Sequence, residues 1–208
     1  MFNLPSLYDV ALLLPAIILG LTFHEFAHGW VADRLGDRTA RAMGRLTINP
    51  VAHVDPIGFL LLFLVGFGWA KPVPVNPYNF RCEIKQGMLL VSLAGPATNV
   101  LLAVVSAVVL GLFYNQQWPY FAEIMDKMIL INIVLAVFNL IPVPPLDGSK
   151  ILAGILPGRQ EWLEQLERFG PILLIVLLFT GVIGYVFSFL VSPIYRVLYN
   201  LASFIAFQ

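Results

Sequence analysis

Cysteine and charged residues are both scarce in this sequence of 208 residues. The single cysteine, Cys82, excludes an intramolecular disulfide and any cysteine-rich metal site. Only 12% of the residues are charged, and 59% are hydrophobic, whereas charged residues make up about 25% of a typical soluble domain. The formal net charge is zero, so nothing favours nucleic acid as a partner. This composition argues against an ordinary soluble domain and predicts an integral membrane protein.

The N-terminus lacks the features of a secretory signal peptide. It has no basic n-region and no A-x-A-like cleavage site, so we expect residues 1–35 to be retained. The sequence also shows no internal repeat, linker or low-complexity tract. We therefore expect residues 1–208 to form a single membrane-embedded domain.

A long uncharged run leads directly into a metal-binding motif. Residues 10–23 carry no charge, and His24, Glu25 and His28 follow in the pattern H-E-x-x-H. Residues four apart lie on one face of a helix, so the two imidazoles can bind one tetrahedral Zn²⁺ while the glutamate takes a proton from a zinc-bound water. A chance match is common on soluble helix surfaces. Here the helix is apolar, and an ionisable side chain at a bilayer centre costs about 2.5–3.5 kcal/mol or more, so a bound metal is the preferred interpretation.

Positive charges follow the first predicted span, which covers residues 7–35. This length crosses a hydrocarbon core of about 30 Å at about 1.5 Å per residue. No lysine or arginine precedes the span, whereas four lie at or just beyond its end: Arg34, Arg38, Arg41 and Arg45. The positive-inside rule therefore places this loop in the cytoplasm and the metal motif in the cytoplasmic half of the membrane.

The segment 57–76 has the features of a re-entrant, β-hairpin-like structure. Residues 57–68 are apolar but too few for a spanning helix. Pro72 and Pro74 suit an edge strand and not a helix interior. A segment that enters and returns keeps Lys71 on the cytoplasmic side, as the charge rule requires. Non-helical backbone at membrane depth must be shielded by protein or line a cavity, and a cavity beside the metal motif provides such a place.

Further apolar segments predict an α-helical polytopic membrane protein with four to six transmembrane helices. Residues 159–169 are amphipathic and charged, which is typical of an interfacial helix. Residues 193–207 form either a surface helix or the last span, and Ser192 and Pro193 suit a helix start. The remaining spans are expected at residues 7–35, 87–113, 126–146 and 170–191.

Three polar residues near these spans are candidates for the site. Asn99 either makes an interhelical hydrogen bond or faces the site and donates a hydrogen bond to an oxyanion. Asp147 follows three prolines that stop a helix. It is either the N-cap of a short helix or, on the same side of the membrane as His28, a third zinc ligand that leaves the fourth position to water. His53 has no partner four residues away, so we expect a satisfied loop histidine or one that orients a ligand, and not a ligand itself.

Two motifs in this order resemble the site-2 protease family of intramembrane zinc metalloproteases. They are H-E-F-A-H at residues 24–28 and N-L-I-P-V-P-P-L-D-G at residues 139–148. The likeness extends to G-P-A-T-N at residues 95–99. The run G-R-L-T-I-N-P-V-A-H-V-D-P-I-G at residues 44–58 is similar to compact bacterial and archaeal members.

The resemblance implies one Zn²⁺ held by His24, His28 and Asp147, with Glu25 as the catalytic acid-base. It implies hydrolysis of a peptide bond in or near the transmembrane helix of a membrane protein, in a prokaryotic cell membrane and on the cytoplasmic side. An edge strand at residues 73–75 would pair with the unwound substrate. These 208 residues leave no room for a PDZ or CBS regulatory domain, so the mode of substrate selection stays open.

Two other functions remain open at this stage. A metal transporter or metal-storing membrane protein would bind zinc without using Glu25 as a base. A catalytically inactive scaffold would keep its function without any zinc.

Overall fold

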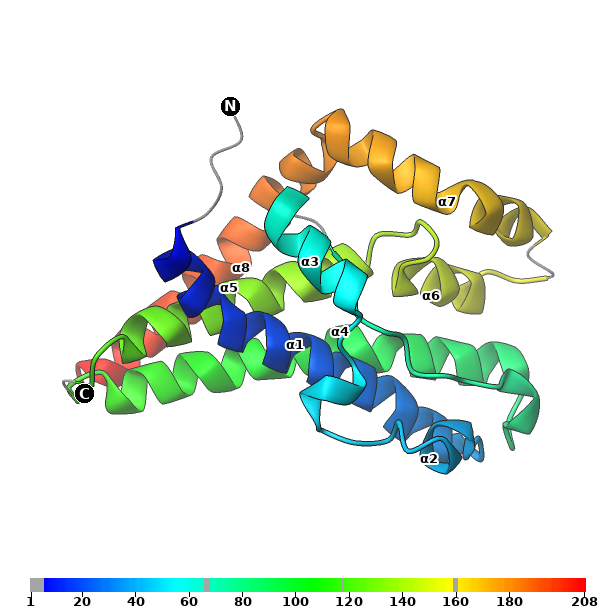
Figure 1. Ribbon diagram of the computed structural model, residues 1–208, viewed down its shortest axis with the longest axis horizontal. Helices are drawn as coiled ribbons and strands as arrows, with labels where there is room; N and C mark the ends of the chain where they lie inside the picture. The colour runs from blue at the N-terminus through cyan, green and yellow to red at the C-terminus, as the bar shows by residue number, and fades with distance from the viewer. Residues whose placement is uncertain (1–5, 66–67, 117, 159–160) are drawn as a thin grey trace.

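Long helices dominate the structure, a computed structural model that describes residues 6–65, 68–116, 118–158 and 161–208 (Figure 1). Two short 3-10 helices, η1 (Pro50–Ala52) and η2 (Pro77–Asn79), lie in the connections. The α-helices are α1 (Leu7–Leu35), α2 (Thr39–Ala42), α3 (Pro56–Val65), α4 (Ile84–Phe113), α5 (Phe121–Asn139), α6 (Asp147–Ile155), α7 (Glu161–Phe179) and α8 (Val182–Ala206).

Helix α1 has well-defined signals at both ends. Ser6 and Asp9 form a capping box, in which each side chain accepts a hydrogen bond from the backbone N–H of the other residue. At the other end, Gly36 adopts φ +115°, a left-handed conformation that glycine tolerates and that closes the helix. Pro15 lies inside α1 without ending it. The helix therefore continues unbroken through the H-E-x-x-H motif.

Three of the described helices are long and apolar enough to cross a membrane: Tyr8–Leu35, Ile84–Phe113 and Val182–Ala206. Large apolar side chains such as Leu101, Leu112 and Phe189 are exposed on the outer faces of α4 and α8. A helix that is apolar all round fits a lipid environment and not an aqueous one. The structure is thus that of a helical membrane protein, although the described residues do not confirm the predicted number of four to six spans.

The main core lies where α4, α5 and α8 pack together. Small side chains bring α4 and α8 close, because a Cβ added at Gly111 would lie 2.6 Å from the carbonyl oxygen of Ala202. Small residues at helix contacts are typical of membrane proteins, where backbones approach each other closely. The buried core residues are Ala103, Ala107, Leu110, Ile129, Ile133, Val137, Val191, Leu198 and Ala202.

The segment predicted as a re-entrant hairpin begins with a helix. Pro56 starts α3, and the Asp55 carboxylate accepts hydrogen bonds from the backbone N–H groups of Ile57 (3.0 Å) and Gly58 (2.8 Å). This is an N-terminal cap followed by proline at the first helical position, which favours helix over strand. Between the described residues of this region, strand pairing is limited to one antiparallel bridge, from Val54 to Ala70. The β-hairpin-like prediction is therefore not confirmed, and residues 66–67 at its centre lie outside the described residues.

A buried carboxylate anchors the chain that follows this bridge to the end of α1. Asp37 is fully buried and accepts hydrogen bonds from the backbone N–H of Thr39 (3.1 Å), the backbone N–H of Asn76 (2.6 Å) and the Nδ2 of Asn79 (2.9 Å). Burial by itself raises the pKa of Asp37, but a hydrogen bond from the Thr39 hydroxyl, together with the three above, outweighs it and holds the pKa below its ordinary value. The extended chain between residues 71 and 76 is thereby held across α1.

The predicted boundaries in the last third of the chain are wrong. Helix α7 runs without a break from Glu161 to Phe179 through Pro171, so the interfacial helix and the start of the next span are one element. The chain turns at Gly181 (φ +77°), and α8 then continues through Pro193, which is not a helix start. Neighbouring helices and local adjustments satisfy the backbone groups that a proline frees in a membrane helix, so proline is a weak stop signal here. Residues 159–160 of the predicted interfacial helix lie outside the described residues.

Candidate metal centre

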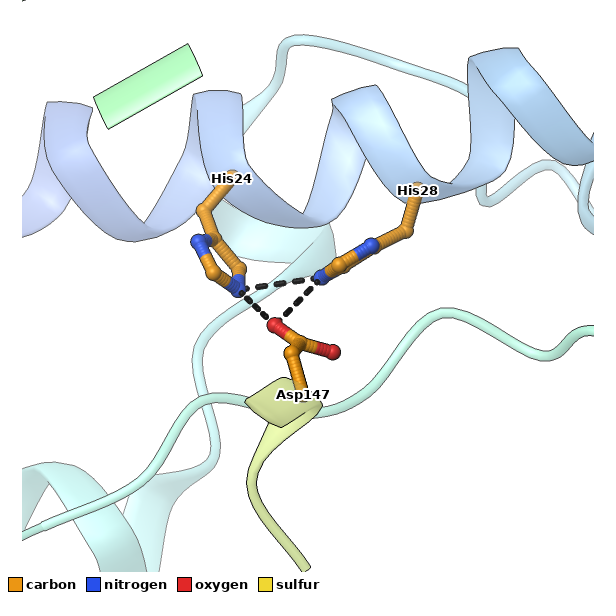
Figure 2. Close-up of side chains that lie close together, drawn as sticks. All are labelled: His24, His28 and Asp147. Carbon is orange, nitrogen blue, oxygen red and sulfur yellow. Dashed lines mark hydrogen bonds and ion pairs between the residues drawn. The ribbon is translucent and has the colours of Figure 1, made fainter. Parts of the chain in front are cut away.

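Two histidines on α1 face the same side of the helix at the centre of the fold (Figure 2). His24 and His28 are buried, with exposed fractions of 5% and 8%. Their Nε2 atoms lie 3.0 Å apart. The four-residue spacing on an unbroken helix thus brings two imidazoles to one point, as the sequence predicted.

The other ring nitrogen of each histidine is hydrogen-bonded to an oxygen. His24 Nδ1 lies 2.7 Å from Asn99 Oδ1, and His28 Nδ1 lies 2.7 Å from the carbonyl oxygen of Val91. These oxygens only accept, so both Nδ1 atoms donate and both neutral rings present a lone pair at Nε2. Both imidazoles are therefore oriented as metal ligands, with their outer nitrogens fixed by the helix α4.

Asn99 joins three helices beneath the histidines. Its Nδ2 donates to the carbonyl oxygen of Gly20 (3.0 Å) and to Asn132 Oδ1 (2.9 Å). Asn132 in turn donates from Nδ2 to the carbonyl oxygen of Met128. Both N–H groups of Asn99 are used, so the amide has none left for an oxyanion, and its oxygen must face His24. This arrangement supports the interhelical hydrogen bond and not the oxyanion donor that the sequence left as alternatives.

The carboxylate of Asp147 reaches the same point from α6. The proline-containing chain after α5 carries it across to α1, and its Oδ2 lies 3.1 Å from His24 Nε2 and 3.2 Å from His28 Nε2 (Figure 2). The N-cap residue of α6 is Leu146, and no side chain makes a capping hydrogen bond there. The alternative prediction of Asp147 as an N-cap is therefore wrong.

These three atoms form an arrangement that a metal ion fits. They lie 3.0, 3.1 and 3.2 Å apart, close to the roughly 3.3 Å that separates tetrahedral ligands bound about 2.0–2.1 Å from zinc. When both imidazoles are neutral, two nitrogen lone pairs and one carboxylate oxygen meet with no hydrogen between them, and among the described residues Asp147 Oδ2 is buried without a hydrogen-bond partner. A divalent cation relieves this mutual repulsion. Within the described part of the chain, no other group of histidine, cysteine or acidic side chains is arranged to hold a metal.

Helix α4 leaves room for the two imidazoles because it carries a glycine beside them. A Cβ added at Gly95 would lie 2.5 Å from His24 Cε1 and 2.5 Å from His28 Nε2. Real Cβ atoms do not approach other atoms this closely. The G-P-A-T-N motif therefore serves the site twice, through this glycine and through Asn99.

Glu25 lies beside the ligand atoms and is held by the extended chain that crosses α1. Its Oε2 accepts a hydrogen bond of 2.8 Å from the backbone N–H of Val73. Arg45 fixes the preceding residues, since its Nη2 donates to the carbonyl oxygens of Lys71 (2.9 Å) and Pro72 (3.2 Å). The sequence suggested that this segment lies near the site but held no sign of this direct contact.

A cleft of about 360 Å³ opens over the three ligand atoms and Glu25. It has both polar and apolar walls, as a site for a peptide requires. Several of its lining residues were not among the sequence candidates. Asn139 opens the second motif and Lys150 follows Asp147 by three positions, so proximity to a motif was the signal that could have identified them. These additional polar residues are Ser92, Asn139 and Lys150.

His53 is a buried loop histidine and lies apart from the three grouped ligand atoms. Its side chain is 1% exposed, and its Nε2 lies 2.7 Å from the carbonyl oxygen of Thr47. The expectation that His53 is not a ligand agrees with this position.

Replacing Asn99 by alanine is expected to weaken zinc binding by about 10–100-fold, because the hydrogen bond that orients His24 is lost. Competition with a chromophoric chelator measures this affinity in the purified protein. Ser106→Ala is the matched control, since Ser106 lies on the same helix and bonds only to the carbonyl of Leu102. Equal zinc affinity in Asn99→Ala and in the control would show that Asn99 does not orient the ligand.

Together, the fold and the site define a helical membrane protein with a buried metal centre of the type found in catalytic zinc enzymes. The model of peptidase family M50 matches residues 115–183, which include Asp147. "Putative zinc metalloprotease YwhC" of Bacillus subtilis is 40% identical over 178 residues, covering 82% of this chain and 81% of the relative. "Putative zinc metalloprotease MJ0611" of Methanocaldococcus jannaschii is 31% identical over 154 residues, covering 73% of this chain and 75% of the relative. "Putative zinc metalloprotease Rip2" of Mycolicibacterium smegmatis is 30% identical over 169 residues, covering 78% of this chain and 64% of the relative. No solved structure matches this chain significantly.

This chain therefore belongs to peptidase family M50, the site-2 protease family. It is a membrane metalloprotease with Zn²⁺ as its cofactor. Such an enzyme implies a membrane protein as substrate and a lipid environment.

Proposed function

We propose that this protein hydrolyses a peptide bond in or near the transmembrane segment of a membrane protein substrate. The convergence of His24, His28 and Asp147 inside a helical membrane fold is the observation that carries the proposal. These three side chains would hold the Zn²⁺, and residues 1–208 would act as a single membrane-embedded protease domain.

Glu25 is the acid-base group in this proposal. When bound, zinc lowers the pKa of a water ligand and polarises a carbonyl group. The carboxylate of Glu25 takes a proton from the attacking water and later passes it to the leaving amine. The hydrogen bond from the Val73 N–H to Oε2 holds one carboxylate oxygen of this cleft-lining residue, and the transfer falls to the other oxygen.

The substrate must be extended before it can be cleaved, because a helix hides its carbonyl groups in its own hydrogen bonds. Val73 and Val75 line the cleft on a chain that Pro72 and Pro74 keep non-helical. Among the described residues, no hydrogen bond is made by the backbone N–H of Val75, so it is available to a substrate carbonyl. Strand addition at this edge would hold an unwound substrate across the metal centre.

Replacing Val73 by proline is expected to lower kcat at least about tenfold, because it removes the N–H that orients Glu25. A hydrogen bond to a charged group is worth about 1.5–3 kcal/mol, and tenfold in rate corresponds to about 1.4 kcal/mol. Zinc content, measured by elemental analysis, should stay at the wild-type value. Val73→Ala keeps the N–H and removes most of the side chain, so a loss in this control as large as in the proline variant would contradict the role of the N–H.

The positive charges at and after the end of α1 support a metal centre on the cytoplasmic side. On a Cys82→Ser background, a cysteine introduced at the exposed Lys71 should react with a membrane-impermeant maleimide only when the cytoplasmic face is accessible. Labelling in intact cells would contradict this orientation.

Proteolysis by the purified protein tests the proposed function directly. The protein in proteoliposomes is expected to cut a single-span reporter substrate, to lose this activity in 1,10-phenanthroline and to regain it when zinc is added. Continued cleavage by protein shown to be zinc-free would refute the proposal. Zinc transport into the vesicles without cleavage of any reporter would favour a transporter instead.

A further inference from the structure

Lys150 lines the cleft of the metal centre from the first turns of α6. It follows Asp147 by three residues, and side chains three apart on a helix start about 5–6 Å from each other. A lysine carries its ammonium on a flexible four-carbon stem. The charged group can therefore reach an oxygen atom held beside the carboxylate of Asp147.

The position of this positive charge is unfavourable for the fold alone. Lys150 lies near the N-terminal end of α6, where the helix dipole disfavours a cation. Its two acidic neighbours in the cleft are engaged elsewhere, because Asp147 faces the histidines and Glu25 accepts from Val73. Among the described residues, Lys150 takes part in none of the ion pairs. It is also the sole lysine or arginine among the described residues that line this cleft.

Three of the four amide N–H groups of Asn99 and Asn139 already make hydrogen bonds within the protein. Asn99 spends both N–H groups on Gly20 and Asn132. Asn139 spends one on the carbonyl oxygen of Leu135. A cation without an ion-pair partner among the described residues, in a cleft whose reaction generates a negative oxygen, can stabilise that oxygen.

We propose that Lys150 is a catalytic residue whose ammonium donates a hydrogen bond to the oxyanion that forms at the scissile carbonyl. This inference rests on the proposed function. The water oxygen bonds to the carbonyl carbon, the π electron pair moves onto the carbonyl oxygen, and the water proton passes to Glu25. When the C–N bond breaks, the electron pair returns to re-form the carbonyl and Glu25 gives its proton to the amine. Lys150 keeps its own proton throughout and stabilises the charge while it exists.

The test compares Lys150→Gln with Lys150→Arg. Removing one oxyanion donor costs about 10²–10³-fold in kcat, so Lys150→Gln is expected to lose about 10²-fold in kcat while KM changes less than about twofold. A phosphinic peptide, which mimics the charged tetrahedral state, should bind this variant about 10²-fold more weakly, since transition-state analogues follow kcat/KM. Lys150→Arg keeps the charge and should recover most of both losses.

Three further measurements distinguish a catalytic role of Lys150 from a structural one. Zinc content should be unchanged in both variants. Uncleaved substrate should bind equally well to Glu25→Gln and to Glu25→Gln carrying Lys150→Gln, because the ground state lacks the oxyanion. Lys127→Gln, near the opposite end of α5 from the cleft, is the matched control and should behave as wild type.

Several results would overturn the role of Lys150. A higher KM with unchanged kcat would show that the lysine binds a substrate carboxylate instead. Unchanged kcat and unchanged phosphinic peptide affinity would show that it takes no part in the reaction. Loss of zinc from Lys150→Gln without rescue by arginine would show a structural role. If the chelator does not inhibit cleavage by the wild type, the proposed function itself has failed. This outcome differs from the three results above, which concern the Lys150 variants.

Discussion

Glu25→Gln is expected to lower kcat by about 10²–10⁴-fold, the contribution of a positioned acid-base group, while the protein keeps its zinc. Glutamine cannot take a proton from water at neutral pH. Its amide oxygen can still accept the hydrogen bond from the Val73 N–H, so the change removes the base and leaves its position intact. Single-turnover cleavage of a reporter substrate, together with zinc content, measures both consequences.

The choice of control makes this result specific. Glu83, an exposed glutamate just before α4, lies outside the cleft, so Glu83→Gln should retain full activity. Glu25 does not belong to the group of three candidate ligand residues. Its replacement should therefore leave metal affinity unchanged. Turnover at the wild-type rate in Glu25→Gln would rule out the glutamate as the base, and loss of zinc would show that it is a ligand.

Gly95→Ala is expected to weaken zinc binding by about 100-fold or more, at or beyond the upper end of effects seen for residues that support metal ligands. The new methyl group would lie within 2.6 Å of both His24 and His28. One imidazole must then move, and the carboxylate of Asp147 would no longer meet both Nε2 atoms. Chelator competition and cleavage of the reporter substrate should both show the loss.

Helix propensity alone would not predict this loss of zinc affinity in Gly95→Ala. Alanine favours a helix interior over glycine by about 1 kcal/mol, so the substitution by itself should stabilise α4. Gly184→Ala on α8 is the control, because nothing lies within 4 Å of a Cβ added there. Zinc affinity in Gly95→Ala equal to that of the control would show that α4 can move away from the histidines at little cost.

Local chemistry is the reason that much of the metal centre could be predicted. The spacing of His24 and His28 has a fixed meaning on any helix, and an apolar membrane helix rarely carries three ionisable residues unless they have a function. Asp147 was predicted as the third ligand for two reasons: the expected topology puts it on the same side of the membrane as His28, and it lies in the second motif of the family. These inferences depend on periodicity and on charge, both of which are properties of short stretches of chain.

Inference from local signals was less reliable where neighbouring segments could form hydrogen bonds with the backbone N–H and C=O groups. Pro193 suggested a helix start, yet α8 runs through it. The Asp55-Pro56 cap starts a helix at the beginning of the segment for which the short apolar run, Pro72 and Pro74, and the charge rule together suggested a re-entrant hairpin. For Pro193 the outcome depends on which backbone groups other parts of the protein can shield, whereas the cap at Asp55 and Pro56 is itself a local signal that favours a helix.

The sequence alone established the membrane class and the helical pair of imidazoles, and it offered Asp147 as a candidate third ligand. Only the packed structure placed the Asn99 amide between His24, Gly20 and Asn132, brought Val73 to Glu25, and left Lys150 in the cleft without an ion-pair partner among the described residues. These hydrogen bonds join residues 33 to 79 positions apart. Hydrogen bonds of this kind follow from how helices pack, and no local pattern of residues encodes that packing.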